Sequence, residues 1–122
     1  MHARPVSLDF VIVDDDASFR EAATTLLLDL GHRVVGEAGS VGAARSEIGR
    51  LRPDAVLLDV NLPDGDGFSL ARELRDNGGP TVLLISTDPD IAPRRTVAEC
   101  GAAGFIDKAR LYGTDLGAYL ET

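Results

Sequence analysis

The chain has 122 residues, a length that suits one globular domain, and its 44% hydrophobic and 26% charged residues are ordinary for a folded protein. The formal net charge of −8, with 12 scattered lysines and arginines, argues against direct binding of nucleic acid. The single cysteine cannot form an internal disulfide, and no apolar run approaches the roughly 20 residues that span a bilayer. We therefore expect one domain over residues 1–122, with its core at about 8–121, in a soluble cytoplasmic protein.

Short apolar runs alternate with helical patterns along the chain. The runs typical of buried strands cover residues 10–13, 33–38, 55–59, 82–86 and 104–108. Apolar residues at helical spacing predict helices at 18–30, 41–51, 68–76 and 93–101, and a last helix within 111–121. A capping box from Ser18 to Glu21 is expected to open the first helix. The alternation predicts an α/β fold, a three-layer sandwich with a five-stranded parallel sheet between flanking helices.

Polar side chains gather where the predicted strands end. They are Asp14, Asp15 and Asp16 after the first strand, Asp59 at the end of the third, Ser86 and Thr87 after the fourth, and Lys108 at the end of the fifth. The carboxyl ends of parallel strands share one edge, and carboxylates that meet there repel one another unless a divalent cation compensates them. Magnesium fits best, because it takes one or two carboxylates together with phosphate oxygens. The pattern therefore predicts phosphoryl chemistry.

Four segments, VIVDDDASFR, VLLDVNLPDGDGF, VLLIST and GFIDKA, together resemble the receiver domain of bacterial two-component response regulators, the CheY-like family. The resemblance covers essentially the whole chain. It implies a flavodoxin-like sheet with strand order 2-1-3-4-5. It also implies a phosphoacceptor at Asp59, which takes a phosphoryl group from a sensor histidine kinase or a phosphotransfer protein and requires Mg²⁺. Such a domain promotes only its own phosphorylation and dephosphorylation and is not otherwise an enzyme.

The resemblance assigns a role to each matched position. Asp14, Asp15 and Asp59 hold the magnesium ion together with the backbone carbonyl of Asn61. Ser86 is the switch hydroxyl, Lys108 binds the phosphoryl group, and Phe105, three residues before that lysine, is the switch aromatic. The surface formed by the fourth helix, fifth strand and fifth helix is expected to contact an effector protein or a second copy of the chain, and no membrane contact is expected.

Two registers are open for the metal-binding acid pair, Asp14 with Asp15 or Asp15 with Asp16. In the family, an arginine or similar residue often lies five positions after the second acid, and Arg20 meets that spacing from Asp15. This favours the first register and leaves Asp16 to begin the helix, where its charge suits the helix dipole. Thr87 and Ala109 stand where the family commonly has alanine and proline.

A magnesium-dependent phosphatase with an aspartyl nucleophile is the alternative function. Such enzymes generally need a second acid two residues after the nucleophile and a cap over the substrate. Here Asn61 takes that position, and no insertion is long enough for a cap. The sequence is compatible both with a stand-alone regulator and with a receiver taken from a longer protein that has its own output domain.

Overall fold

The computed structural model describes residues 7–88, 90 and 94–120. Its strands are β1 (Asp9–Val13), β2 (Arg33–Ala38), β3 (Ala55–Asp59), β4 (Asn61–Leu62), β5 (Gly65–Asp66), β6 (Thr81–Ser86) and β7 (Gly104–Asp107). Its helices are α1 (Ala17–Asp29), α2 (Val41–Leu51), α3 (Gly67–Asp76), α4 (Arg94–Glu99), a 3₁₀ helix (Lys108–Gly113) and α5 (Gly117–Leu120). None of the helices in these residues has the length and apolar character needed to cross a bilayer.

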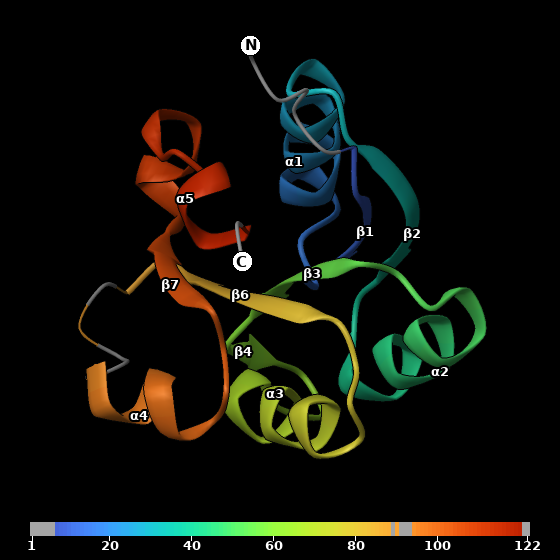
Figure 1. The fold of residues 1–122 in the computed structure, drawn as a ribbon, viewed down its shortest axis with the longest axis vertical. Helices are drawn as coiled ribbons and strands as arrows, with labels where there is room; N and C mark the ends of the chain where they lie inside the picture. Colours follow the sequence, from blue (N-terminus) through green and yellow to red (C-terminus); the bar gives the residue numbers. More distant parts are fainter. Residues whose placement is uncertain (1–6, 89, 91–93, 121–122) are drawn as a thin grey trace, which may run out of the picture.

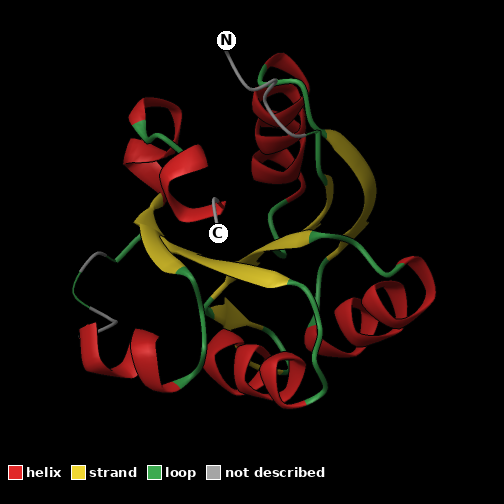
Figure 2. Cartoon of the chain, viewed as in Figure 1, coloured by secondary structure: helices red, strands yellow, loops and turns green. Residues whose placement is uncertain are grey.

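Five of the strands form one parallel sheet, in the order β2-β1-β3-β6-β7. With the short β4–β5 pair set aside, this is the predicted order 2-1-3-4-5, and the α/β sandwich is confirmed (Figure 2). The antiparallel β4–β5 pair, which joins Asn61 to Asp66 and Leu62 to Gly65, was not predicted. It turns the segment after β3 into a small hairpin.

Helices cover both faces of the sheet: α1 and α5 lie on one side, and α2, α3 and α4 on the other (Figure 1). Alternate residues of the strands therefore enter two separate apolar clusters. One contains Val11, Val13, Val56, Leu58, Val82 and Leu84 from the sheet, and the other contains Phe10, Ile12, Leu57, Leu83 and Ile85. This burial on both faces explains the continuous apolar runs of the sequence.

The first helix begins one residue before its predicted start. Its N-cap is Asp16, whose carboxylate accepts hydrogen bonds from the backbone N–H groups of Ser18 (2.9 Å) and Phe19 (3.4 Å). The expected capping box from Ser18 to Glu21 is therefore wrong. Asp16 is two residues closer to the end of β1 than Ser18 is. Its carboxylate therefore accepts hydrogen bonds from the free N–H groups at the start of α1 in place of the Ser18 hydroxyl.

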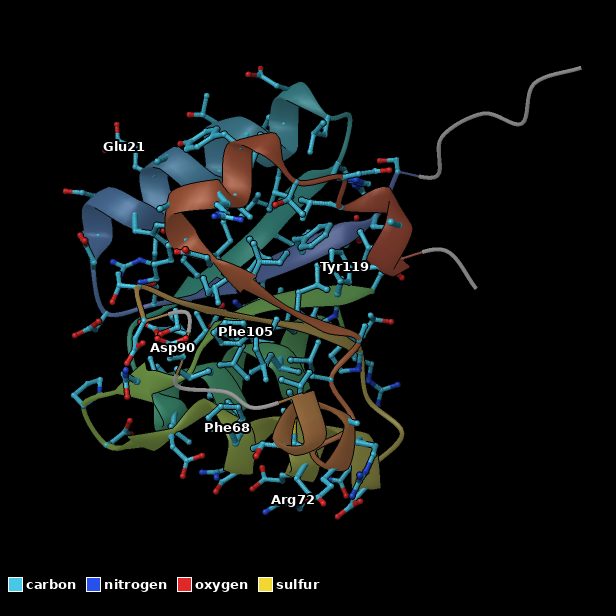
Figure 3. All side chains as sticks on the ribbon, turned by 90° about the vertical axis from the view of Figure 1, so that its left-hand side faces the viewer. Glu21, Phe68, Arg72, Asp90, Phe105 and Tyr119 are labelled. Carbon is cyan, nitrogen blue, oxygen red and sulfur yellow. The ribbon has the colours of Figure 1, made fainter. Side chains whose placement is uncertain are left out.

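The end of the described chain is less helical than predicted. A helix is present within 111–121, as predicted, but it is only the four-residue α5, and a 3₁₀ helix that follows β7 directly precedes it. Two glycines, Gly113 and Gly117, lower helix propensity across this stretch. Tyr119 of α5 nevertheless packs on the sheet, where a Cβ at Gly104 of β7 would overlap its ring (Figure 3).

Gly67, at the start of α3, lies so close to the end of β3 that a Cβ would overlap the carbonyl oxygen of Asp59. We expect Gly67→Ala to lower the free energy of unfolding by about 1–3 kcal/mol, since the backbone must move to admit the methyl group. Gly49, an exposed position in α2 where a methyl group would meet nothing within 4 Å beyond the nearby backbone of its own helix, is the control. Gly49→Ala should stabilise the protein by about 0.5–1 kcal/mol. Urea denaturation measures both, and a Gly67→Ala protein as stable as the wild type would contradict the expectation.

Candidate functional site

Asp14 and Asp59 lie at the carboxyl ends of the neighbouring strands β1 and β3. Val13 of β1 is paired with Leu58 of β3, so Asp14 and Asp59, the next residues along, lie side by side at the carboxyl edge. Oxygen atoms from the carboxylates of Asp14, Asp15 and Asp59 all lie within 4.8 Å of one another. The structure thus brings the three predicted metal-binding side chains together, at the point where strand order reverses.

Asp14 is fully buried, and its surroundings fix its position. Its carboxylate accepts a hydrogen bond from the N–H of Asp16 (2.9 Å), and its own N–H donates to the carbonyl of Ala38 in β2 (3.0 Å). The guanidinium of Arg20 donates to the Asp14 carbonyl (2.6 Å) and to the carboxylate of Glu37 (3.0 Å). Arg20 therefore ties the turn after β1 to the end of β2.

Asp59, the predicted phosphoacceptor, is 5% exposed. One carboxylate oxygen accepts the backbone N–H of Asn61 (3.1 Å) and the other accepts a hydrogen bond from Lys108 Nζ (3.2 Å). Burial raises the pKa of Asp59 above its ordinary value, and the negative charge of Asp14 adds to this rise against the opposing effects of Asn61 and Lys108. Its charged form is thus less favourable in the folded protein than in the unfolded chain.

Lys108 reaches the acidic cluster from the carboxyl end of β7, the edge strand two places from β3 in the sheet. Its ammonium forms ion pairs with Asp14 and Asp59, and it lies 4.5 Å from the centre of the Phe19 ring. Burial by itself lowers the pKa of Lys108, but the hydrogen bond and charge of Asp14, together with Asp59, outweigh it and raise the pKa overall. The ammonium therefore compensates the two buried carboxylates.

The carboxylates of Asp15 and Asp16 lie in different places. Asp15 is exposed but contributes an oxygen to the cluster, whereas the carboxylate of Asp16 caps α1. This geometry favours Asp14 with Asp15, the register that the position of Arg20 indicated.

The remaining predicted residues lie around the cluster. Ser86 is buried at the end of β6, and its hydroxyl oxygen accepts the N–H of Asp88 (3.0 Å). Asn61 is exposed in β4, with its backbone beside Asp59. Phe105 is half-buried in β7, and like Phe68 of α3 it packs against the apolar cluster on the α2, α3 and α4 side (Figure 3). Of these three, only Asn61 makes a direct hydrogen bond to the acidic cluster among the described contacts.

Sequence reasoning missed two contacts. The ring of Phe19 was not expected beside Lys108, because apolar spacing predicts only that it faces the core. Asp64, at the tip of the β4–β5 hairpin, accepts the N–H groups of Val41 (2.7 Å) and Gly42 (3.0 Å) at the start of α2, and these hydrogen bonds lower the pKa of Asp64. An aspartate in a Pro/Gly turn signals a hydrogen bond of this kind but does not reveal its partner.

Comparison with known proteins assigns the family. A family model for the response regulator receiver domain matches residues 10–112. The chain belongs to this family. The solved signal receiver domain of NarL from Mycobacterium tuberculosis is similar to this receiver domain, with a TM-score of 0.83 and 33% identity, covering 97% of this chain and 100% of that one.

Two curated relatives are longer than this receiver domain. The DNA-binding transcriptional activator DevR/DosR of Mycobacterium tuberculosis is 39% identical over 100 residues, which cover 80% of this chain and 46% of that protein. Protein-glutamate methylesterase/protein-glutamine glutaminase 5 of Anaeromyxobacter dehalogenans is 36% identical over 112 residues, covering 89% of this chain and 30% of that protein. The receiver domain thus spans less than half the length of each.

The raised pKa of Asp59 gives a stability prediction. We expect Asp59→Asn to raise the free energy of unfolding at pH 7 in magnesium-free buffer, because it removes a buried charge beside Asp14. The gain should shrink as the pH falls through the raised pKa of Asp59 in the folded wild type and should be lost below the ordinary value of 3.8, because the carboxyl is then protonated in both states. Chemical denaturation at several pH values measures it.

Asp16→Asn is the matched control, since it removes one negative charge close to Asp14 in the chain but keeps a residue that caps a helix well. Its effect should stay within about 0.5 kcal/mol. An Asp59→Asn protein less stable than the wild type at pH 7 would contradict the prediction.

Proposed function

We propose that this receiver domain accepts a phosphoryl group on Asp59, with Mg²⁺ held by Asp14, Asp15 and Asp59 and by the backbone carbonyl of Asn61. The proposed donor is a sensor histidine kinase or a phosphotransfer protein. The observation that supports this most strongly is the convergence of three carboxylates within 4.8 Å beside the ammonium of Lys108.

The donor set fits magnesium. It consists of hard oxygen ligands, and a third carboxylate, from the exposed Asp15, lies next to the two that Lys108 already compensates. Magnesium bound there would neutralise charge on the transferring phosphoryl group and on the carboxylates.

The chain's own residues supply the remaining chemistry. A carboxylate oxygen of Asp59 attacks phosphorus and forms a new P–O bond, while the P–N bond of a phosphohistidine breaks. The histidine nitrogen keeps the electron pair of that bond and takes up a proton. Lys108, within reach of Asp59, carries positive charge to the phosphoryl oxygens.

The same arrangement argues against a phosphatase of unactivated esters. An ester leaving group needs a proton from a general acid, and the position two residues after Asp59 is Asn61, whose amide cannot act as one. Phosphohistidine and acyl phosphates are activated donors and need less help at the leaving group. We therefore propose a signalling role and no turnover of phosphate esters.

We also propose that phosphorylation shifts a conformational equilibrium through Ser86 and Phe105, and that residues 1–122 act as one receiver unit. The buried hydroxyl of Ser86 accepts a hydrogen bond from Asp88, and a hydroxyl that accepts one hydrogen bond can donate its own proton to a phosphoryl oxygen. Phe105 lies on β7, next to β6, where it can respond to a movement of Ser86. The surface of α4, β7 and α5 would then contact an effector protein or a second copy.

Magnesium binding is tested by titration with isothermal calorimetry. We expect Asp15→Asn and Asp59→Asn each to weaken magnesium affinity at least about tenfold, because each removes one anionic ligand. Asp16→Asn changes the net charge equally but lies outside the cluster, so its affinity should equal that of the wild type. Equal affinities in all four proteins would remove the metal assignment.

Phosphorylation is tested with acetyl phosphate and magnesium, followed by intact mass spectrometry. The wild type should gain one phosphate, about 80 Da, as acetate leaves with the electrons of the broken P–O bond, and Asp59→Ala should gain none. Glucose 6-phosphate serves as the ester control and should release no phosphate. Repeated turnover of that ester, or an adduct that persists in Asp59→Ala, would contradict the proposal.

A further inference from the structure

The aromatic ring of Phe19 occupies a defined place beside the site. Phe19 lies in the first turn of α1, is half-buried, and packs against the apolar cluster on the α1 and α5 side of the sheet. The centre of its ring is 4.5 Å from Lys108 Nζ, well inside the distance of about 6 Å at which an aromatic face attracts a cation. The ring thus touches the charged end of this side chain.

The ammonium of Lys108 is held by contacts of two different kinds. Asp14 and Asp59 attract it through ion pairs, whereas the Phe19 ring attracts it through its π face. The side chain is only 13% exposed, so water screens these attractions weakly. Lysine has a flexible four-carbon stem, and a contact at its tip restricts where the charge can lie.

The two kinds of contact respond differently to the chemistry proposed above. Both carboxylates belong to the proposed metal and phosphoryl site, so their attraction for Lys108 weakens once a divalent cation neutralises them. The ring carries no charge and is not a metal ligand, so its contact can persist. It therefore keeps the ammonium beside Asp59 when the ion pairs no longer do so.

We propose that Phe19 is a positioning residue that holds the Lys108 ammonium at the site during phosphoryl transfer to Asp59. This inference rests on the proposed function and adds to it a residue from α1 that acts through the lysine. The aromatic face is the required property, so tyrosine should replace phenylalanine and leucine should not.

The first experiment measures the rate of phosphorylation by acetyl phosphate at saturating magnesium. Phe19→Leu should lower the rate constant about 3- to 10-fold, whereas Phe19→Tyr should stay within about twofold of the wild type. Leu26→Ala is the packing control, because Leu26 is half-buried on the same helix and against the same cluster, and its rate should match the wild type. Magnesium affinity should be the same in all four proteins.

A double-mutant cycle tests whether Phe19 acts through the lysine. In a Lys108→Met background, Phe19→Leu should cause no further loss of rate. An equal loss in both backgrounds would overturn the proposal, as would a wild-type rate in Phe19→Leu. A Phe19→Tyr protein as slow as Phe19→Leu would also overturn it.

A spectroscopic measurement is independent of activity. The ring of Phe19 should shift the NMR signals of the Lys108 ε-methylene protons upfield; Phe19→Tyr should keep this shift and Phe19→Leu should abolish it. If the Lys108 ε-methylene signals are the same in Phe19→Leu as in the wild type, the Phe19 ring does not lie against the ammonium end of Lys108. If the wild type shows the shift but accepts no phosphate, the proposed function fails, and the role of Phe19 in phosphoryl transfer fails with it. If the wild type accepts phosphate and the Phe19→Leu protein accepts it equally fast, only the role of Phe19 fails.

Discussion

Two buried carboxylates beside each other are the constraint on which this site depends. Parallel pairing of β1 and β3 places Asp14 and Asp59 at one level, where they repel each other and lose most of their hydration. Such a pair is tolerated only when positive charge lies close to it. Lys108 provides that charge from the carboxyl end of β7, the edge strand of the sheet. An added divalent cation is the natural complement for the third acid, Asp15.

The loops that carry the acids are fastened to neighbouring elements. The turn after β1 is held by the Asp16 cap and by Arg20, which also reaches the end of β2. The hairpin after β3 is fixed at its base by the bond from Asn61 to Asp59 and at its tip by Asp64, which binds the start of α2. These contacts set the positions of the carboxylates before any ligand arrives, which reduces the reorganisation that binding requires.

Most of the fold and the residues of the site could be predicted from the sequence, but the contacts between those residues could not. The strand at 33–38 and the helix at 41–51 were predicted to the residue, because apolar periodicity follows directly from burial. The convergence of the acids followed from parallel topology. Asp16 was expected to begin the first helix, but the capping box from Ser18 to Glu21 was wrong because the carboxylate of Asp16 accepts the free N–H groups instead. The last helix is shorter than its predicted segment because Gly113 and Gly117 lower helix propensity there. The Phe19 contact was missed because it depends on where the start of α1 lies relative to Lys108 in the folded protein.

The reach of Lys108 across the sheet also determines when the site can form. Asp59 and Lys108 are 49 residues apart in the chain, and Asp14 lies farther away still. The ribosome makes the chain from its N-terminus, so both aspartates are synthesised well before their lysine. Until β7 pairs with β6, Lys108 is not in place, and the carboxylates at the ends of β1 and β3 lack their counter-ion. Burying them at that stage is opposed by the repulsion between their negative charges. Closure of this edge therefore follows the synthesis of β7, the last strand of the described sheet in chain order.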